Sequence, residues 1–232
     1  MKAIVTGGSR GIGRSISNVL LREGCEVMIT GTNINQGNTS EFKYFKVDFK
    51  DKDSTAEFLQ EAKSFQPEIL VNNAGINVID NFEDIKEHDF DDIIKVNLKA
   101  PFLTCQAVIP SMKEKNYGRI VNIGSIFSIL SKAKRASYSA SKFGLDGLTK
   151  ALASEVSEFN ILANCVSPGV IETDLTRKIL GEAGISQMKK NIPQGRLGGT
   201  EEVAELVFWL ASKNNSYISG QNILIDGGYS VV

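Results

Sequence analysis

Short apolar runs alternate with amphipathic segments along the whole chain. The apolar runs predict strands at residues 2–6, 26–30, 42–48, 68–72, 119–125, 161–169 and 222–226. Most of these runs are continuous rather than alternating, which is typical of strands buried on both faces of a parallel sheet. Apolar residues at helical spacing predict helices at residues 11–23, 53–65, 137–158 and 201–212, and one or two more within 83–115, the second at about 98–115.

Strands and helices that alternate in this way predict an α/β fold. We expect one doubly wound Rossmann domain over residues 1–232, with a parallel sheet of about seven strands and helices on both faces. Residues 31–41, between the second and third strands, are polar and too short for a full crossover helix. Residues 170–199 read as less regular, and we expect 174–199 to form a mobile lid over a substrate.

The composition excludes several classes of function. With 26 basic and 27 acidic residues the net charge is −1, which favours neither nucleic acid nor an anionic membrane as a partner. No apolar run approaches the roughly 20 residues that span a bilayer. Cys25, Cys105 and Cys165 are scattered in apolar segments, which indicates a reducing compartment and hence the cytoplasm. The lone His88 has no cysteine nearby, so we expect a solvated helix residue and no metal site.

A glycine-rich turn, "TGGSRGIG" at 6–13, follows the first predicted strand and opens the first predicted helix. Gly7, Gly11 and Gly13 permit positive φ and let a pyrophosphate approach the helix N-terminus, although their spacing is not the strict GxGxxG. The alternative is a plain strand-to-helix turn. The position directly after the first strand favours a dinucleotide site.

The second predicted strand ends "ITGTN", without the acidic residue that usually binds the ribose of NAD. Arg10, inside the glycine turn, could pair with a 2′-phosphate, and Thr32 could add a hydroxyl. These residues favour NADP(H), with NAD(H) as the alternative cofactor. The alternative reading of Arg10 is a solvated loop residue.

Tyr138 and Lys142, in "SYSASKFG", share one helix face about 6 Å apart. A phenol can protonate an alkoxide that develops when a carbonyl is reduced, and an adjacent ammonium stabilises the phenolate. Ser125 ends a predicted strand, where doubly wound sheets bind ligands, and Asn97 lies in a helical stretch although Asn is a poor helix former. The alternatives are an idle surface pair, a strand cap and a plain polar helix residue.

Six motifs stand in register along essentially the whole chain, and together they resemble the short-chain dehydrogenase/reductase family. Bacterial 3-oxoacyl-[acyl-carrier-protein] reductases are the most similar members, particularly in "GRIVNIGS", "GRLGGTEEVAE" and the C-terminal residues 217–232. The six motifs are "TGGSRGIG" (6–13), "NNAG" (72–75), "KVNLKAPF" around Asn97, "NIGS" ending at Ser125, "YSASK" (138–142) and "PGVIETDLT" (168–176).

The resemblance implies hydride transfer between a nicotinamide and a carbonyl or alcohol. It implies that Ser125, Tyr138, Lys142 and Asn97 are catalytic, that Lys142 also binds the nicotinamide ribose, and that Asn97 kinks its helix and holds a water of the proton relay. Gly75 would border the adenosine side, and Asp48, alternatively a turn or N-cap residue, would reach the adenine amine. The implied cofactor-binding residues are Gly7, Ser9, Arg10, Gly11, Ile12, Gly13, Thr32, Asp48, Phe49, Asn73, Ala74, Gly75, Tyr138, Lys142, Pro168, Gly169, Ile171 and Thr173.

The leading functional hypothesis is therefore the NADP(H)-dependent reduction of a 3-oxoacyl thioester on acyl carrier protein. A sugar, polyol or other small alcohol is the alternative substrate, and a catalytically silent cofactor-binding or scaffold subunit is the alternative class. Such reductases present two basic residues to the carrier. Arg177 matches one, whereas the other position holds Asn116, for which the basic residues Lys113, Lys115, Lys132, Lys134 and Arg135 could compensate. The resemblance also implies a homotetramer, built through residues 98–115, 137–158 and the last strand.

Overall fold

The computed structural model describes residues 1–33 and 41–232, the side chain of Leu175 excepted. In that part of the chain, seven parallel strands form one sheet in the order β3-β2-β1-β4-β5-β6-β7. This confirms the predicted doubly wound α/β fold and the number of strands. The strands are β1 (Lys2–Val5), β2 (Glu26–Gly31), β3 (Lys43–Lys46), β4 (Ile69–Asn72), β5 (Gly118–Ile123), β6 (Ile161–Pro168) and β7 (Asn222–Ile225).

The strand order reverses beside β1, which pairs with β2 on one side and β4 on the other. Val5, the last residue of β1, lies opposite Ile29 of β2 and Val71 of β4. The chain crosses the sheet in opposite directions from this point, so a crevice opens at the carboxyl ends of β1 and β4. The glycine turn, residues 6–13, starts there.

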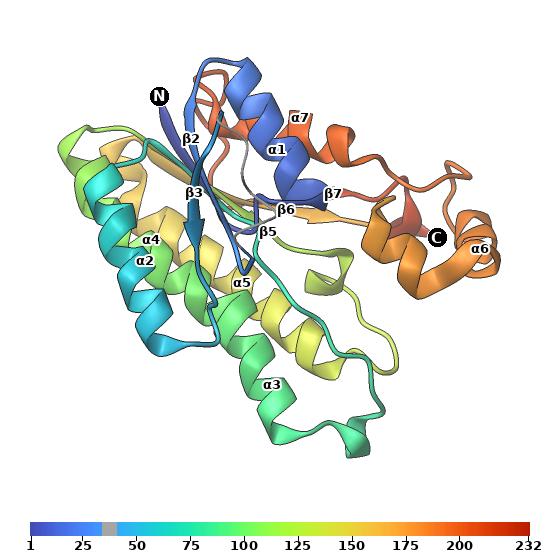
Figure 1. Cartoon of the computed structure of the whole chain (residues 1–232). Helices are drawn as coiled ribbons and strands as arrows, with labels where there is room; N and C mark the ends of the chain where they lie inside the picture. The colour runs from blue at the N-terminus through green and yellow to red at the C-terminus, as the bar shows by residue number, and fades with distance from the viewer. Residues whose placement is uncertain (34–40) are drawn as a thin grey trace.

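Helices cover both faces of the sheet, as Figure 1 shows. α1 (Gly11–Arg22) and α7 (Thr200–Ala211) pack side by side on one face, and α2 (Lys52–Phe65), α4 (Ala100–Glu114) and α5 (Ala136–Val156) cover the other. Each face has its own apolar core. Strand residues alternate between the two cores because successive side chains point to opposite faces: Val5 belongs to one and Ile4 to the other.

The segment α6 (Asp174–Lys190) differs from the prediction, which read residues 170–199 as irregular. Thr173 caps this helix by accepting a hydrogen bond from the backbone N–H of Thr176 at 3.1 Å. Gly181 interrupts the helix with φ 60° and ψ 178°. The two parts of α6 therefore do not share one continuous helical pattern of apolar residues. In Figure 1, α6 stands away from the sheet, next to the C-terminus.

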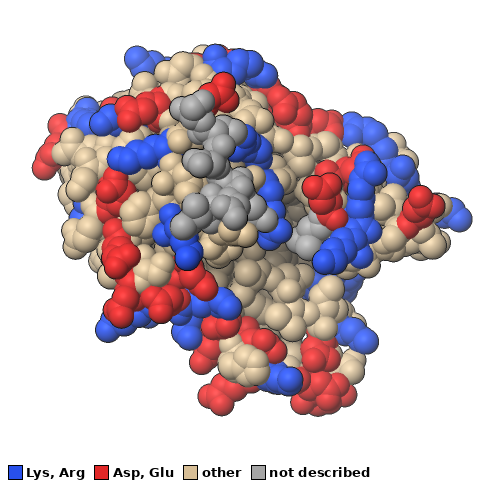
Figure 2. All heavy atoms as spheres, in the orientation of Figure 1, with Lys and Arg blue, Asp and Glu red and all other residues tan. Residues whose placement is uncertain are grey.

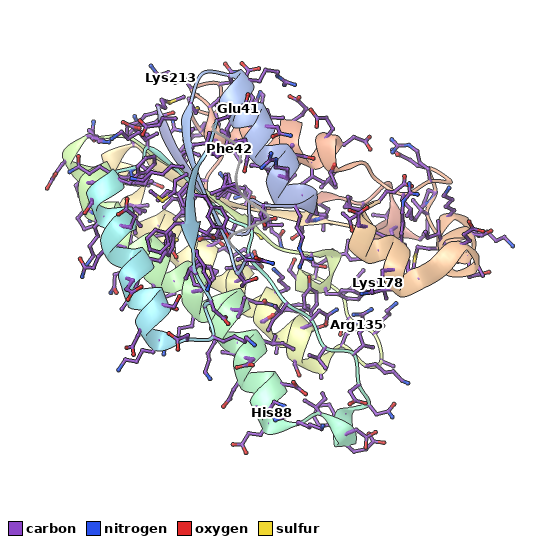
Figure 3. The ribbon with its side chains drawn as sticks, in the orientation of Figure 1. Glu41, Phe42, His88, Arg135, Lys178 and Lys213 are labelled. Atoms are coloured by element: carbon purple, nitrogen blue, oxygen red, sulfur yellow. The ribbon has the colours of Figure 1, made fainter. Side chains whose placement is uncertain are left out.

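Shorter elements connect these units. His88 projects from α3 at the edge of the molecule and is exposed, as predicted (Figure 3). The prediction that no full crossover helix fits between the second and third strands falls largely on residues 34–40, which lie outside the described residues. These elements are η2 (Phe82–Asp84), α3 (Glu87–Ile94), η3 (Lys95–Lys99), η4 (Ile126–Ser128), η5 (Ser157–Phe159) and η6 (Tyr229–Val231).

The surface carries both signs of charge. Figure 2 shows Lys and Arg interspersed with Asp and Glu over the face in view, in keeping with the net charge of −1. Among the described residues, no helix is both long enough and apolar enough to cross a bilayer. Cys25, Cys105 and Cys165 are buried free thiols.

Candidate active site

Lys142 lies in α5, one turn after Tyr138, as the spacing predicted. The side chain of Lys142 is almost fully buried, with 4% of its surface exposed, and its Nζ donates a hydrogen bond of 2.7 Å to the backbone carbonyl of Ile123. The same Nζ lies 5.7 Å from the centre of the half-buried Tyr138 ring. The end of β5 therefore anchors the ammonium beside the phenol, where its charge can stabilise a phenolate.

Asn97 lies in η3, a π-helical turn between α3 and α4. Its Oδ1 accepts a hydrogen bond from the backbone N–H of Ile76 at 2.8 Å, and its Nδ2 donates to the carbonyl of Ile76 at 2.9 Å. The same Nδ2 donates to Ser141 Oγ at 3.1 Å. The predicted departure from regular helix is thus a π turn, a type of bulge that is frequent at functional sites. Through this turn Asn97 fastens the loop after β4 to α5.

Ser125 lies directly after β5, in extended conformation. Its Oγ accepts a hydrogen bond from the backbone N–H of Phe127 at 3.2 Å, which leaves the hydroxyl proton available to another acceptor. The Phe127 ring contacts Tyr138 edge-on, with 6.2 Å between centroids. Phe127 therefore contacts Ser125 through its backbone and Tyr138 through its ring.

Three polar side chains, those of Ser128, Ser167 and Asn222, bond to one another next to Ser125. Ser128 Oγ donates to the backbone carbonyl of Ser125 at 2.7 Å. The same oxygen contacts Ser167 Oγ at 2.9 Å and accepts from Asn222 Nδ2 at 2.9 Å, while Ser167 donates to Asn222 Oδ1 at 2.6 Å. Residues of β6 and β7 thus fix the position of the serine.

The glycine turn has the backbone that a pyrophosphate requires. Gly7 and Gly11 have φ of 64° and 54°, which favours glycine at both positions. A Cβ on Gly13 would lie 2.3 Å from the carbonyl oxygen of Gly7 and 2.4 Å from Asn73 Nδ2, so no larger residue fits there. Asn73 Nδ2 donates to the carbonyls of Thr6 and Gly7, each at 3.0 Å. This bonding holds the turn open at the N-terminus of α1.

Arg10 and Thr32, predicted to bind the ribose and its phosphate, belong to the glycine turn and to the residues directly after β2. Arg10 precedes α1 in extended conformation with an exposed side chain, and Thr32, also exposed, follows β2. Gly31 lies under this corner, because a Cβ there would come within 3.0 Å of Ser9 Oγ. The corner offers donors and, among the described residues 31–33, no carboxylate.

The other predicted residues on the adenine side have structural contacts of their own. Asp48 Oδ1 accepts from the backbone N–H of Lys50 at 3.0 Å, which is a turn contact. Phe49 is buried and packs edge-on against Phe58, with 5.6 Å between centroids, so only its backbone could meet a ligand. Gly75, predicted at the adenosine side, lies near Lys142: a Cβ there would be 3.9 Å from Nζ.

The loop after β6 closes the other side of the crevice. Pro168 ends β6, and the Gly169 N–H donates to the carbonyl of Ile225 at 2.9 Å. Ile171 is buried, and Thr173 faces the glycine turn, since a Cβ on Gly11 would lie 3.7 Å from Thr173 Cγ2. A dinucleotide therefore fits this crevice. The glycines and the N-terminus of α1 suit its phosphates, and the Lys142 ammonium beside the Tyr138 phenol suits its reacting end.

Comparison with known proteins agrees with this geometry. A family model described as "Enoyl-(Acyl carrier protein) reductase" matches residues 7–230. The chain belongs to the short-chain dehydrogenase/reductase family. It is 40% identical to the 3-oxoacyl-[acyl-carrier-protein] reductase FabG of Salmonella typhimurium over 99% of this chain and 97% of that protein. It is 38% identical to the FabG of Escherichia coli, again over 99% and 97% of the two chains.

Solved structures of other short-chain dehydrogenases and reductases have the same fold. A gluconate 5-dehydrogenase from Burkholderia cenocepacia, in complex with NADP and tartrate, superposes with a TM-score of 0.92 at 28% identity over 100% of this chain and 95% of that chain. A 4-hydroxyisoleucine dehydrogenase complexed with NADH gives 0.93 at 30% identity, over 100% and 99%. This dehydrogenase/reductase is therefore an oxidoreductase that acts on alcohol or carbonyl groups with a nicotinamide cofactor.

Sequence reasoning missed residues that hold this short-chain dehydrogenase/reductase site together. Thr6 Oγ1 accepts from the backbone N–H groups of Asn73 and Ala74, at 3.0 and 3.1 Å. Ser141 Oγ donates to the carbonyl of Tyr138 at 2.7 Å while it accepts from Asn97. The available signal for Thr6 was a hydroxyl residue between the first apolar run and the glycine turn. Nothing in the sequence distinguishes Ser141 from the neighbouring Ser139.

Proposed function

We propose that this enzyme reduces a 3-oxoacyl thioester, carried on acyl carrier protein, to the 3-hydroxyacyl thioester with NADP(H). The observation that carries the proposal is the buried Lys142, fastened to the end of β5 beside Tyr138 and backed by Asn97. The curated relatives at about 40% identity are named as enzymes of that reaction. The intact serine, tyrosine and lysine argue against a silent scaffold subunit.

In the proposed mechanism the substrate carbonyl lies between Ser125 and Tyr138. The nicotinamide supplies the hydride when it is bound. The Ser125 hydroxyl donates a hydrogen bond to the carbonyl oxygen and orients it. Tyr138 then gives its phenolic proton to the developing alkoxide, and the Lys142 ammonium stabilises the phenolate that remains. The loop that Asn97 fixes offers the Ile76 carbonyl to a water that returns the proton through Lys142.

The proposed cofactor is NADP(H), held by the glycine turn and by Arg10 and Thr32. Arg10 is exposed next to the ribose corner, so its guanidinium can reach a 2′-phosphate and pair with it in bidentate form. Arg10→Glu should therefore raise the KM for NADPH about tenfold or more and leave that for NADH nearly unchanged. An unchanged ratio of the two KM values would favour NAD(H).

The proposed carrier site centres on Arg177 of α6. This guanidinium is exposed and pairs with Glu172 at 2.6 Å. An acidic helix of a carrier would have to displace Glu172, which costs little because exposed ion pairs contribute about 1 kcal/mol or less. We further propose that residues 174–199 close over the substrate, that the enzyme is a homotetramer and that it acts in the cytoplasm.

The central test is a NADPH oxidation assay with a 3-oxoacyl thioester, for the native enzyme and for Tyr138→Phe. The variant should lose at least about 100-fold in kcat, since general acid catalysis contributes that much, and should still enhance NADPH fluorescence. Full activity in Tyr138→Phe would refute the mechanism. Turnover of gluconate or another polyol without turnover of the thioester would establish the alternative substrate class.

A further inference from the structure

Arg135 is a partly buried cation next to the catalytic tyrosine. It directly precedes α5, three residues before Tyr138, and its guanidinium carbon lies 5.6 Å from the centre of the Phe127 ring. Phe127 in turn contacts Tyr138 edge-on. Figure 3 shows Arg135 at the start of α5, on the side of the molecule where α6 stands and far from Lys213. The guanidinium is therefore separated from the Tyr138 phenol by no more than the Phe127 ring.

The guanidinium of Arg135 lacks the acceptor that such a group requires. In residues 1–33 and 41–232, no hydrogen bond or ion pair engages it, and its Nε is buried without a partner. Burial lowers the pKa of this group, and the nearby Tyr138 acts in the opposite direction. By contrast, the terminal nitrogens of the buried Arg119 donate to backbone carbonyls, although its Nε is also unpartnered, and Arg196 forms a bidentate pair with Glu202. The terminal nitrogens of the partly buried Arg135 have no such protein acceptor among the described residues, so a ligand oxygen can occupy them.

The positive charge around Arg135 favours a ligand group with an electron-rich oxygen. Lys132 Nζ lies 5.8 Å from the same Phe127 ring, and Lys134 is one residue before Arg135, so residues 132–135 carry three positive charges and no carboxylate. Both lysines are exposed and solvated, whereas the arginine is half-buried. A planar guanidinium binds a carboxylate or an acyl oxygen through charge-assisted hydrogen bonds.

We propose that Arg135 binds the oxygen on carbon 1 of a 3-oxoacyl group while Ser125 and Tyr138 hold the oxygen on carbon 3. This assignment rests on the proposed function and adds to it a determinant of specificity. The shared chemistry is an acyl oxygen two carbons from the reduced carbonyl, supplied either by a thioester or by a free 3-oxo acid. Arg135 moves no proton; it orients the substrate and selects 3-oxoacyl compounds over simple ketones.

The test compares Arg135→Gln and Arg135→Lys with the native enzyme on three substrates. These are a 3-oxoacyl thioester of N-acetylcysteamine, acetoacetate and a methyl ketone without a second oxygen. For Arg135→Gln we expect kcat/KM to fall about 10- to 100-fold on the thioester and further on acetoacetate, with no change on the ketone. Arg135→Lys should recover part of the loss on acetoacetate, because it keeps the charge.

Lys213→Gln is the matched control, since this exposed lysine lies at the opposite side of the molecule in Figure 3. It should match the native enzyme on all three substrates, and NADPH binding, measured by fluorescence, should be the same in every variant. Equal losses on all substrates, or no loss on either 3-oxo compound, would overturn the assignment of Arg135.

The failures of the two proposals are distinguishable. Native activity on acetoacetate but not on the thioester, with the loss in Arg135→Gln, would support Arg135 and overturn the carrier-linked substrate. Native activity on the thioester that is insensitive to Arg135→Gln would support the proposed function and overturn Arg135. Native activity on the methyl ketone alone would overturn both.

Discussion

At the scale of single residues, burial decides which polar groups of this enzyme react. Lys142 is nearly inaccessible, but it has the Ile123 carbonyl as an acceptor and a phenol nearby, so its charge is placed where the proposed reaction needs it. The three cysteines are also buried, and burial raises the pKa of each thiol; the charge of Lys142 offsets only part of this effect at Cys165. The same removal from water that positions Lys142 therefore disfavours the reactive thiolate form of the cysteines.

The single acceptor of Lys142 also limits which residues can replace it. A guanidinium is planar and needs more acceptors than the single carbonyl that Lys142 uses, so Lys142→Arg is not a conservative change here. We expect kcat to fall about 100-fold or more while the apparent melting temperature changes by only a few degrees. Activity within about threefold of the native enzyme would show that position 142 needs only a charge.

The cysteines give a prediction with a pH dependence. Burial raises the pKa of Cys105 to about 12 and that of Cys165 to about 11, and it also raises that of Cys25. Thiols react as thiolates, which are scarce below the pKa. Native protein at pH 8 should therefore show almost no reaction with Ellman's reagent over minutes, and three equivalents should react in denaturant. Rapid native labelling of Cys105 would show that the core opens.

At the scale of elements, the π turn η3 places the side chain of Asn97 where it contacts both the loop after β4 and the helix α5. The buried Asn97 makes three hydrogen bonds, two to the backbone of Ile76 and one to Ser141 Oγ. The loop after β4 and the helix α5 are thereby joined through one side chain. The proposed proton path depends on this junction, because it offers the Ile76 carbonyl to water.

Asn97→Asp tests that junction with little change in volume. The aspartate still accepts from the Ile76 N–H, but an ionised carboxylate cannot donate to the Ile76 carbonyl or to Ser141. We expect a loss of about 2 kcal/mol or more in the free energy of unfolding and a large fall in kcat. Urea denaturation and the reductase assay measure the two effects. Asn18→Asp, at an exposed position of α1, is the control.

The N-terminus of α7 carries a second prediction at this scale. Glu202 accepts from both terminal nitrogens of Arg196 and from the Gly199 N–H, and these contacts hold its pKa at about 2, below its ordinary 4.5. The stabilisation is present above pH 4.5 and disappears as the pH falls through about 2. Glu202→Gln should lower the free energy of unfolding at pH 7 by only roughly 0.5 kcal/mol, because solvent screens the exposed pair.

The matched measurement is the difference in unfolding free energy between native and Glu202→Gln protein at pH 7, 5 and 3. It should stay constant from pH 7 to pH 5 and shrink at pH 3, where the unfolded carboxylate is protonated. A difference that grows toward acid pH would contradict the role assigned to the Arg196 pair.

At the scale of the whole molecule, apolar side chains remain exposed on the elements expected to meet other subunits. Phe102 of α4, Phe143 of α5 and Trp209 of α7 are each more than 40% exposed, and Val231 and Val232 end the chain at more than 80%. Burial between copies of this chain, as the proposed tetramer requires, would remove these side chains from water.

Light scattering should therefore give a mass about four times the 25.3 kDa of one chain, in keeping with the proposed tetramer. Phe102→Glu and Phe143→Glu should reduce this mass, since a charge in an apolar interface lacks a partner. Glu155→Gln, at an exposed position of α5, is the control. A monomeric native protein that is fully active would refute the tetramer and its relevance to activity.

The sequence alone determined the architecture, because apolar periodicity and glycine placement are local consequences of covalent structure. Its motifs also singled out Ser125, Tyr138 and Lys142, because together they resemble those of the short-chain dehydrogenase/reductase family. Only the tertiary structure decided that Gly75 lies beside Lys142, that α6 is a helix broken at Gly181, and that Arg135 Nε has no partner among the described residues. Those facts depend on which atoms of distant segments meet, and burial and hydrogen bonding are settled only when the chain has packed.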